Sequence, residues 1–340
     1  MSALAIEIIR SVEALAARES AWWHLAGRAS AATPFQTPAW LLAWWRHLGH
    51  GQLAAIAVRE GDQLLALLPL AVVGEGAQRR LAWVGAGISD YLTALVDDAR
   101  ADEAWPHVER GLRELVAEIG RARLENVPEG DPLLGRLSSP HQPWRHRRSE
   151  DAICLWGELP DAHEIERHPR VSAKARAATR RLARLGPVTF TSFGADEIAR
   201  HSELRVPLLE SLFELHTREW RARGEDGVLA APSVRAHHRE AAEALGRRGA
   251  LRLHALSHGG ETIGVVYAFV FRARLWMYLG GFSPAHARFS PGSILIEHTR
   301  RAARADGALA MDFLRGEEAY KYRWGVRVRR TFCVELERAG

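Results

Sequence analysis

The stretch WMYLGGFSPAHARFSPGSILIEHTRRAARADGALAMDFLRGEEAYKYRWG, residues 276–325, decides the fold. Its first four residues are aromatic and apolar, which predicts a buried strand. The glycine pair at 280–281 is expected to end this strand, because glycine tolerates backbone angles that other residues do not. Proline and glycine at 291–292 predict the start of a helix, and the Asp-Gly pair at 306–307 predicts its end. A further short strand is expected over 309–314.

A strand that ends beside the N-terminus of the next helix favours an anion site. Backbone N–H groups and the helix dipole both point at that place, and the expected guest is a phosphate. Each such interaction contributes only about 0.3–1 kcal/mol at an exposed terminus, so several are needed, together with cations such as Arg288.

Composition predicts a globular chain with one or two cores. The 340 residues, 47% of them hydrophobic, can bury one large core or two of ordinary domain size. The longest apolar run, 64–73, contains Pro69 and is far shorter than the roughly 20 residues that span a bilayer. Glu7 precedes any long apolar stretch, so we expect no signal peptide. Two cysteines, Cys154 and Cys333, give no metal-ligand spacing, so we expect no metal and a cytoplasmic location.

The net charge of +5 conceals an asymmetry between the two halves of the chain. Residues 1–165 contain 16 basic and 22 acidic side chains, whereas residues 166–340 contain 30 basic and 19 acidic ones. The second half is therefore the one suited to an anion. A nucleotide-bearing cofactor and a nucleic acid both fit this charge, which alone does not distinguish them.

An apolar pattern occurs twice. The run LAAIAVREGDQLLALLPLAVV at 53–73 aligns without a gap with LRLHALSHGGETIGVVYAFVF at 251–271, so that Gly61 falls on Gly259. In each copy a further strand, a helix and a short strand follow. We interpret this as a divergent internal duplication that produces two mixed α/β domains of the same plan.

The two copies differ where chemistry would have to happen. The first has no Pro-Gly helix entry, and its last strand runs into ENVPEGDPL at 125–133, which contains no Tyr, Lys or Arg. We therefore expect residues 166–340 to hold the ligand site. Residues 1–165 are expected to be a structural partner or one wall of the acceptor cleft.

Two runs carry a resemblance to a known family. GGFSPAHARFSPGSILIEH at 280–298 and DFLRGEEAYKYRWG at 312–325 resemble the C-terminal half of GNAT-type acyltransferases associated with polysaccharide (cellulose) biosynthesis, which are similar to Fem-type peptidoglycan bridge enzymes. TPFQTPAWLLAWWRHLGHG at 33–51 resembles the N-terminal signature of the same family. The resemblance implies two tandem GNAT-like domains, each a mixed, mostly antiparallel sheet flanked by helices. It also implies acetyl-CoA or another acyl-CoA as donor and a sugar or amine as acceptor.

The absence of several catalytic motifs from the sequence also favours an acyl-transfer reaction. The sequence has no GxSxG elbow, Walker phosphate loop, GxGxxG fingerprint or HExxH pair, which leaves direct group transfer by proximity. A thioester donor would lie along the strand 276–279 with its pyrophosphate at the helix start. The residues expected to bind it are Tyr278, Leu279, Gly280, Arg288, Ser290, Pro291, Gly292 and Ser293.

Three residues at the end of the last strand and just after it are the catalytic candidates. Asp312 could hold or deprotonate the acceptor, or it could pair with Arg315 or Lys321. Tyr320 could protonate the departing thiolate, or it could only pack. Lys321 is one of two lysines against 44 arginines. This bias suggests a role that needs a compact point charge rather than a planar guanidinium.

The acceptor is expected to contact residues from two segments. An amphipathic helix over 208–220 carries His216, which could be a base or a satisfied core histidine, and also Trp220. The run DFLRGEEAYKYRWG at 312–325 adds Arg315 and Glu317. The simpler interpretation of Glu317 is a solvated side chain with no contact to the acceptor.

Two other functions stay open. A Fem-like transferase would use an aminoacyl-tRNA donor, gripped by the arginine-rich segment SAKARAATRRLARLG at 172–186, whose simpler interpretation is a solvated helix face. We expect nucleic acid as a partner only in that case. The third possibility is a catalytically silent subunit of a polysaccharide-synthesis assembly.

Overall fold

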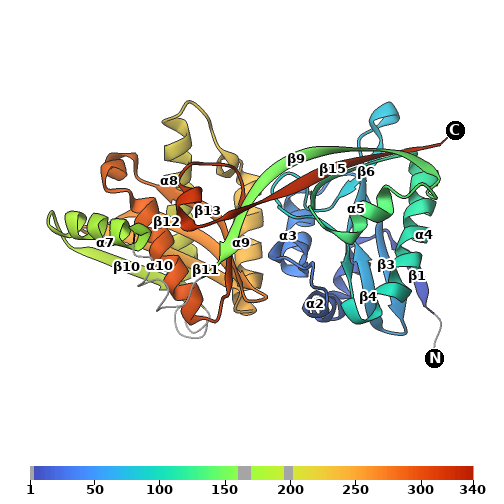
Figure 1. The fold of residues 1–340 in the computed structure, drawn as a ribbon, viewed down its shortest axis with the longest axis horizontal. Coiled ribbons are helices and arrows are strands. Elements are labelled where there is room, and N and C mark those ends of the chain that lie inside the picture. The colour runs from blue at the N-terminus through green and yellow to red at the C-terminus, as the bar shows by residue number, and fades with distance from the viewer. Residues whose placement is uncertain (1–3, 160–169, 195–201, 340) are drawn as a thin grey trace. The chain divides into compact units, whose positions relative to one another are not determined.

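The computed structural model describes residues 4–159, 170–194 and 202–339, shown in Figure 1. The chain divides into two compact units. Unit 1 comprises Met1–Ile153 together with Arg329–Gly340, and unit 2 comprises Cys154–Val328. The last strand of the chain thus returns to unit 1. The sequence prediction, with contiguous domains at 1–165 and 166–340, did not include this return. The separate roles expected for the two domains stay predictions.

Unit 1 contains two sheets. The smaller has the strand order β1-β3-β4-β7, with antiparallel neighbours throughout. The other has, within unit 1, the order β9-β15-β8-β6-β5-β2, where β9 (Trp144–Glu158) continues into unit 2. Of the pairs β15–β8, β8–β6, β6–β5 and β5–β2, only β6 and β8 are parallel. The strands are β1 (Ala5–Ile9), β2 (Gln52–Leu53), β3 (Ala55–Glu60), β4 (Gln63–Leu68), β5 (Leu70–Val73), β6 (Arg80–Trp83), β7 (Leu95–Val96), β8 (Arg121–Pro128) and, starting in unit 2, β15 (Arg327–Arg338).

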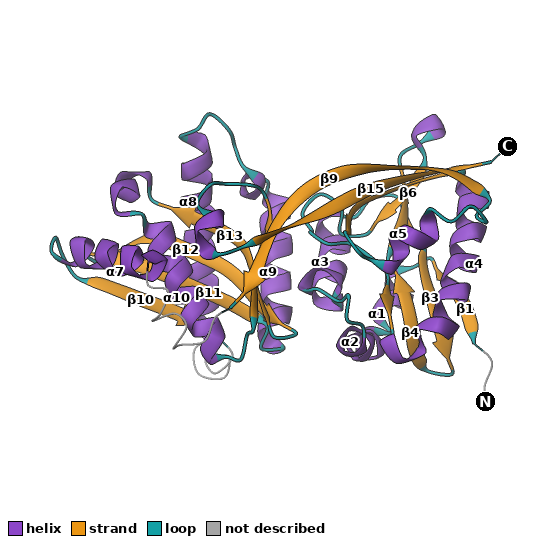
Figure 2. Cartoon of the chain, viewed as in Figure 1, coloured by secondary structure: helices purple, strands orange, loops and turns teal. Residues whose placement is uncertain are grey.

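Helices enclose these sheets. They are α1 (Val12–Ala16), α2 (Glu19–Arg28), α3 (Pro38–Leu48), α4 (Ala101–Ile119) and α5 (Pro132–Leu137). The long helix α4 packs on β1, β3 and β4 (Figure 2). Its close approach depends on Gly111, since a Cβ there would lie 2.8 Å from Ile56 Cγ2. The broad apolar stripe of α3, including Trp40, Leu41 and Trp44, is buried.

Unit 2 is one sheet with helices packed on it. Its order is β10-β11-β12-β13-β14-β9, and only β13 and β14 are parallel. The strands are β10 (Val188–Phe193), β11 (Leu251–His258), β12 (Glu261–Phe271), β13 (Arg274–Phe282), β14 (Ala310–Arg315) and the unit 2 end of β9 (Trp144–Glu158). The helices are α7 (Arg170–Ala183), α8 (Arg205–Arg221), α9 (Pro232–Arg247) and α10 (Pro291–Ala305), with the 3-10 turns η7 (Pro284–Phe289) and η8 (Lys321–Trp324). Helices α8 and α10 both pack on β11, β12 and β13.

Strand β13 differs from the sequence prediction in length. The glycines at 280–281 lie inside it rather than ending it. The prediction was wrong because these glycines serve packing instead of a turn. A Cβ on Gly281 would lie 2.6 Å from the backbone N of His216, so only glycine lets α8 sit this close to the strand.

Several other sequence predictions are confirmed. The fold is mixed α/β in both units. Gly61 and Gly259 occupy the turns of corresponding hairpins with φ of 57° and 59°. Helix α10 begins at Pro291, and Asp306 is its C-cap. Thr37 is the N-cap residue of α3 but makes no side-chain capping bond, because its hydroxyl donates to the carbonyl of Pro34 at 2.7 Å.

No helix in the described part of the chain is both long and apolar enough to cross a bilayer.

Candidate active site

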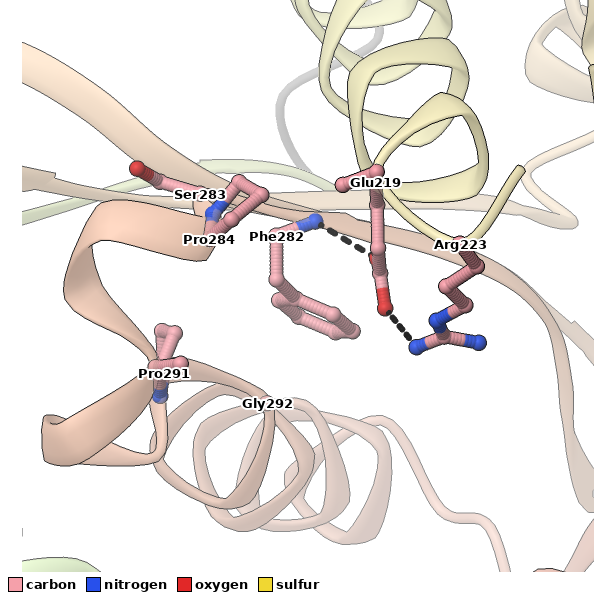
Figure 3. Close-up of a pocket in the computed structure, with 9 residues that line it drawn as sticks. Glu219, Arg223, Phe282, Ser283, Pro284, Pro291 and Gly292 are labelled. Carbon is pink, nitrogen blue, oxygen red and sulfur yellow. Dashed lines mark hydrogen bonds and ion pairs between the residues drawn. The ribbon is translucent and has the colours of Figure 1, made fainter. Parts of the chain in front are cut away.

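A cavity of about 290 Å³ lies in unit 2 where β13 ends and α10 begins (Figure 3). Its lining comes from three elements, the C-terminal end of α8, the end of β13 with η7, and the first turn of α10. The residues are Glu219, Ala222, Arg223, Phe282, Ser283, Pro284, Ala287, Pro291 and Gly292. This is the strand end and helix start at which the sequence predicted a phosphate.

Strand β13 is irregular beside this cavity. Tyr267 of β12 pairs with Leu279, and Ala268 pairs with Met277, so Tyr278 is an extra, bulged residue. On its other edge β13 pairs with β14 only over residues 274–276. The parallel pairing therefore stops before Tyr278, Leu279 and Gly280, the strand positions predicted to bind the donor.

The N-terminus of α10 has no side-chain cap. Ser290 is the N-cap residue with φ of 52°, and its hydroxyl makes no capping bond. Pro291 has no N–H, while the N–H groups of Ser290 and Ser293 donate to the carbonyls of Ala287 and Ser290 at 2.9 and 3.0 Å. Of residues 290–293, Gly292 is thus the one whose backbone N–H has no hydrogen-bond acceptor among the described residues. The amide contribution to an anion site is smaller than the sequence predicted.

Arg288 adds the cation. It lies in η7, is exposed, and its guanidinium stacks over the ring of Phe289 at 4.8 Å. The first turn of α10 contains no acidic residue. The helix dipole and the Gly292 amide therefore lie at this end of the cavity, and Arg288 follows the lining residue Ala287 directly in the sequence without lining the cavity itself.

Glu219 is the carboxylate that lines the cavity, and no sequence pattern predicted it. Its carboxylate accepts a hydrogen bond from the backbone N–H of Phe282 at 3.2 Å and pairs with Arg223 at 2.5 Å, as Figure 3 shows. Burial raises the pKa of Glu219, against the opposing effects of Arg223 and the Phe282 N–H. The available signal was its position on α8, three residues after His216 and one before Trp220.

Tyr320 does not line the cavity, but the charge of Glu219 acts on its phenol. Burial, together with the smaller effects of the charges of Glu318 and Glu219, raises the pKa of Tyr320 to about 12. The residue as a whole is 41% exposed, and its ring contacts that of Phe313 with centroids 6.3 Å apart. A phenol that keeps its proton and reaches solvent beside a carboxylate can act as an acid.

Asp312 is placed differently from Tyr320. It is fully buried in the middle of β14, where its Oδ1 accepts from the N–H of Leu314 at 2.9 Å. Its Oδ2 lies 3.6 Å from the guanidinium of Arg274. These contacts fix the end of β14, so the predicted contact of Asp312 with an acceptor stays a prediction that the geometry does not favour.

Lys321 is also buried. Its ammonium donates to the carbonyls of Arg315 and Gly316 at 2.7 and 3.2 Å and pairs with Glu318 at 2.8 Å. These contacts use all three of its protons. These bonds close the loop from Arg315 to Lys321, which also carries Tyr320. A compact ammonium fits the space between its two carbonyls. The role of Lys321 on a phosphate or carbonyl stays a prediction.

The predicted acceptor residues do not form one group. His216 is buried in α8 with its ring centroid 5.7 Å from that of Trp220, and burial lowers its pKa to about 4. His216 is therefore neutral near pH 7. Arg315 and Glu317 are exposed, and Glu317 accepts from the hydroxyl of Tyr322 at 2.9 Å. The structure brings His216 and Trp220 to the helix that lines the cavity.

No group of histidine, cysteine and carboxylate side chains in the described residues is arranged to hold a metal ion.

The family comparison matches the part of the chain that contains this cavity. Residues 169–322 match a family model described as an acetyltransferase (GNAT) domain. The fold is GNAT-like. The more specific polysaccharide-associated family of the sequence analysis has no such support.

Solved structures are similar over nearly the whole chain. A crystal structure of FemX has a TM-score of 0.65 and 12% identity, covering 96% of each chain. A conserved protein of unknown function from Bacteroides thetaiotaomicron has a TM-score of 0.58 and 10% identity, covering 97% of this chain and all (100%) of that one. L-PGS from Bacillus licheniformis has a TM-score of 0.54 and 13% identity, covering 88% and 91%. No curated protein matches the sequence. At these identities the likeness concerns the fold alone.

Proposed function

We propose that the protein is a cytoplasmic acyltransferase that moves an acetyl or other acyl group directly from acyl-CoA to an amine or hydroxyl. A sugar or cell-envelope polysaccharide precursor is the proposed acceptor class, which rests on the sequence resemblance. The observation that carries the proposal is the cavity between the bulged, half-unpaired strand β13 and the uncapped start of α10.

The donor fits this cavity in two parts. The pyrophosphate is assigned to Arg288 and the N–H of Gly292, where the helix dipole adds to the attraction. The thioester arm is assigned to the edge of β13 from Tyr278 to Phe282, where polar backbone groups leave the ladder with β14. The apolar walls of Pro284, Ala287 and Pro291 suit the parts of the donor that carry no charge.

Transfer then needs two proton movements. The acceptor nitrogen or oxygen attacks the carbonyl carbon, and its proton passes to the carboxylate of Glu219. The carbon–sulfur bond breaks, and the thiolate takes the phenolic proton of Tyr320. The pKa of Glu219, raised by burial, suits a base, and that of Tyr320, near 12, suits an acid that stays protonated.

Asp312 and Lys321 are assigned positioning roles. Asp312 holds the end of β14, and Lys321 closes the loop from Arg315 that presents Tyr320. Unit 1 has no catalytic residue in this proposal.

A second candidate is a Fem-like transferase with an aminoacyl-tRNA donor. The observation that favours it is the similarity to FemX across nearly the full length of both chains. Both candidates share direct transfer at β13 and differ in the donor.

Thermal-shift measurements with acetyl-CoA, longer acyl-CoA and aminoacyl-tRNA separate these functions, because a ligand that binds only the folded state stabilises it. We expect stabilisation by an acyl-CoA and release of free CoA thiol on addition of a matching amine or sugar. Stabilisation by aminoacyl-tRNA alone would favour the second candidate. Stabilisation by none would favour a silent subunit of an assembly and contradict the proposal.

A further inference from the structure

Helix α7 presents a row of cations for which the described part of the chain shows no carboxylate partner. Its buried side consists of Ser172, Ala175, Ala178 and Leu182. The exposed positions of the helix and of the turn that follows carry five cations: Lys174, Arg176, Arg180, Arg181 and Arg184. The chain contains no aspartate or glutamate from residue 170 to residue 194. Within the described ranges, none of the five cations makes an ion pair.

This pattern is unusual for the molecule. Helix α9, for example, pairs Arg247 with Glu243 one turn earlier at 2.6 Å, and α4 pairs Arg113 with Glu109 in the same way at 3.2 Å. Solvated helix faces elsewhere in the chain thus use opposite charges at i and i+4. The face of α7 uses one sign only, which costs repulsion and favours an anionic partner.

An exposed leucine lies at the end of this row. Leu185 follows the last arginine in the turn between α7 and β10 and is 60% exposed. In Figure 1 this turn is the outermost part of unit 2, at the far left. The adjacent Gly186 and Pro187 fix the turn on its neighbours, since the carbonyl of Pro187 accepts from the N–H of Gly259 at 2.9 Å. The backbone of the turn therefore holds Leu185 in an exposed position away from the core.

The charges around the turn remain positive on balance. Helix α7 contacts η7, which carries His286 and Arg288. His258 lies at the same end, with its ring 5.6 Å from that of His286. A carboxylate, Glu261, also lies at this end, where it faces His258 across the hairpin of β11 and β12.

We propose that α7 and its turn form a docking surface for an anionic membrane. The five cations would bind lipid phosphates, and Leu185 would enter the interface between headgroups and acyl chains, as in interfacial helices that combine a basic face with an apolar contact. An RNA would use the same cations but has no use for the leucine. Aromatic stacking for bases is also lacking in the described part of this hairpin, because Phe190 already stacks on His298 with ring centroids 4.4 Å apart.

Vesicle sedimentation tests this proposal with the full chain. The probes are neutral vesicles of phosphatidylcholine and anionic vesicles that also contain phosphatidylglycerol, in low and high salt, with bulk tRNA as a competing ligand. We expect binding to anionic vesicles only, weakened by salt. The double variant Arg180→Glu/Arg181→Glu should lose at least about tenfold in binding.

Two matched controls make the result specific. Arg247→Glu/Arg248→Glu reverses another adjacent pair of exposed arginines, at the end of α9, and should bind as the wild type does. Leu185→Ser should weaken vesicle binding and leave any tRNA binding unchanged, whereas Leu309→Ser, at a leucine that is 59% exposed elsewhere, should change neither. Circular dichroism verifies that each variant is folded. Equal binding to neutral and anionic vesicles, or vesicle binding that Leu185→Ser leaves unchanged, would overturn the proposal. So would tighter binding of tRNA than of vesicles, lost in the α7 double variant.

Discussion

Helices α4 and α10 follow corresponding strands in the two copies of the duplicated plan, yet their N-termini differ. The first turn of α4 contains Asp102 and Glu103. The 3-10 turn before it is capped by Asp97, which also pairs with Arg28 at 2.6 Å. The first turn of α10 has no acid, and its N-cap serine makes no capping bond. Neither helix has a side-chain capping bond at its own N-cap, Arg100 in α4 and Ser290 in α10, so the two helix starts differ in charge. Carboxylates in the first turn of α4 complement its dipole, and their absence from the first turn of α10 suits the anion proposed there.

The sheets of the two units also differ at corresponding strands. In unit 1, Pro69 separates β4 from β5, and these two strands belong to different sheets. In unit 2 the corresponding strand β12 is continuous, and β13 follows it with a bulge. The two copies of the plan therefore differ at one helix start and one strand, which are the places where the ligand site is proposed in unit 2.

The largest expected effect concerns the carboxylate of unit 2's cavity. Glu219→Gln keeps the shape and should lower acyl transfer by about 10²-fold or more, because an amide cannot take the proton of the acceptor. Thiol release with acetyl-CoA and an active acceptor is the measurement. Glu214→Gln on the same helix, at an exposed position, is the control and should leave the rate unchanged. Equal rates in both variants would remove Glu219 from the reaction.

Acid stability should distinguish the two units. The buried histidines of the described chain, His216, His237, His238 and His254, all lie in unit 2. Burial lowers the pKa of His216 to about 4 and that of His254 to about 3. Below pH 6.5 the unfolded chain binds protons that the folded one does not, so stability falls as the pH drops from about 6.5 towards 4.

Hydrogen exchange followed by mass spectrometry checks this expectation. Protection in α8 and β11 should fall at pH 5 before protection in α4 and β3 does. His216→Gln should reduce the pH dependence, and His107→Gln, in unit 1, should not. Simultaneous loss of protection in both units would contradict the assignment of the acid sensitivity to unit 2.

Lys321→Ala tests the loop that has no counterpart in unit 1. Loss of the ammonium leaves the carbonyls of Arg315 and Gly316 without their donor, which should cost about 1–3 kcal/mol in the free energy of unfolding. Denaturant titration measures it. A large loss of turnover with unchanged stability would instead favour the catalytic role predicted from the sequence.

Ser290→Asp transfers the chemistry of unit 1 to α10. Aspartate tolerates the left-handed backbone of this position, so the fold should persist. Its charge should weaken acyl-CoA binding about tenfold, which corresponds to about 1.4 kcal/mol. Ser290→Asn, neutral and of the same shape, should bind nearly as the wild type does. Equal affinities of both variants would mean that no ligand anion lies at this helix start.

The fold was largely predictable because it depends on local patterns. Gly61 and Gly259 marked corresponding hairpins, and Pro291 marked the start of α10. The extent of β13 was not predictable, since the need for glycine at position 281 comes from α8, more than sixty residues earlier in the chain. The return of β15 to unit 1 likewise depends on pairing with β8, about two hundred residues away.

The candidate site was predictable in place and less so in detail. The sequence located the strand end and helix start that border the cavity. It missed Glu219, because a glutamate followed by an arginine one turn later is typical of a solvated helix face. It also offered Asp312 and Lys321 as reacting groups, where burial and hydrogen bonds give them structural contacts.

A crystal structure of the protein with CoA tests the central comparison most directly. The account predicts the diphosphate at the first turn of α10, beside Gly292 and Arg288, with the thiol arm along β13. A diphosphate bound at α4 in unit 1, or anywhere away from α10, would contradict it.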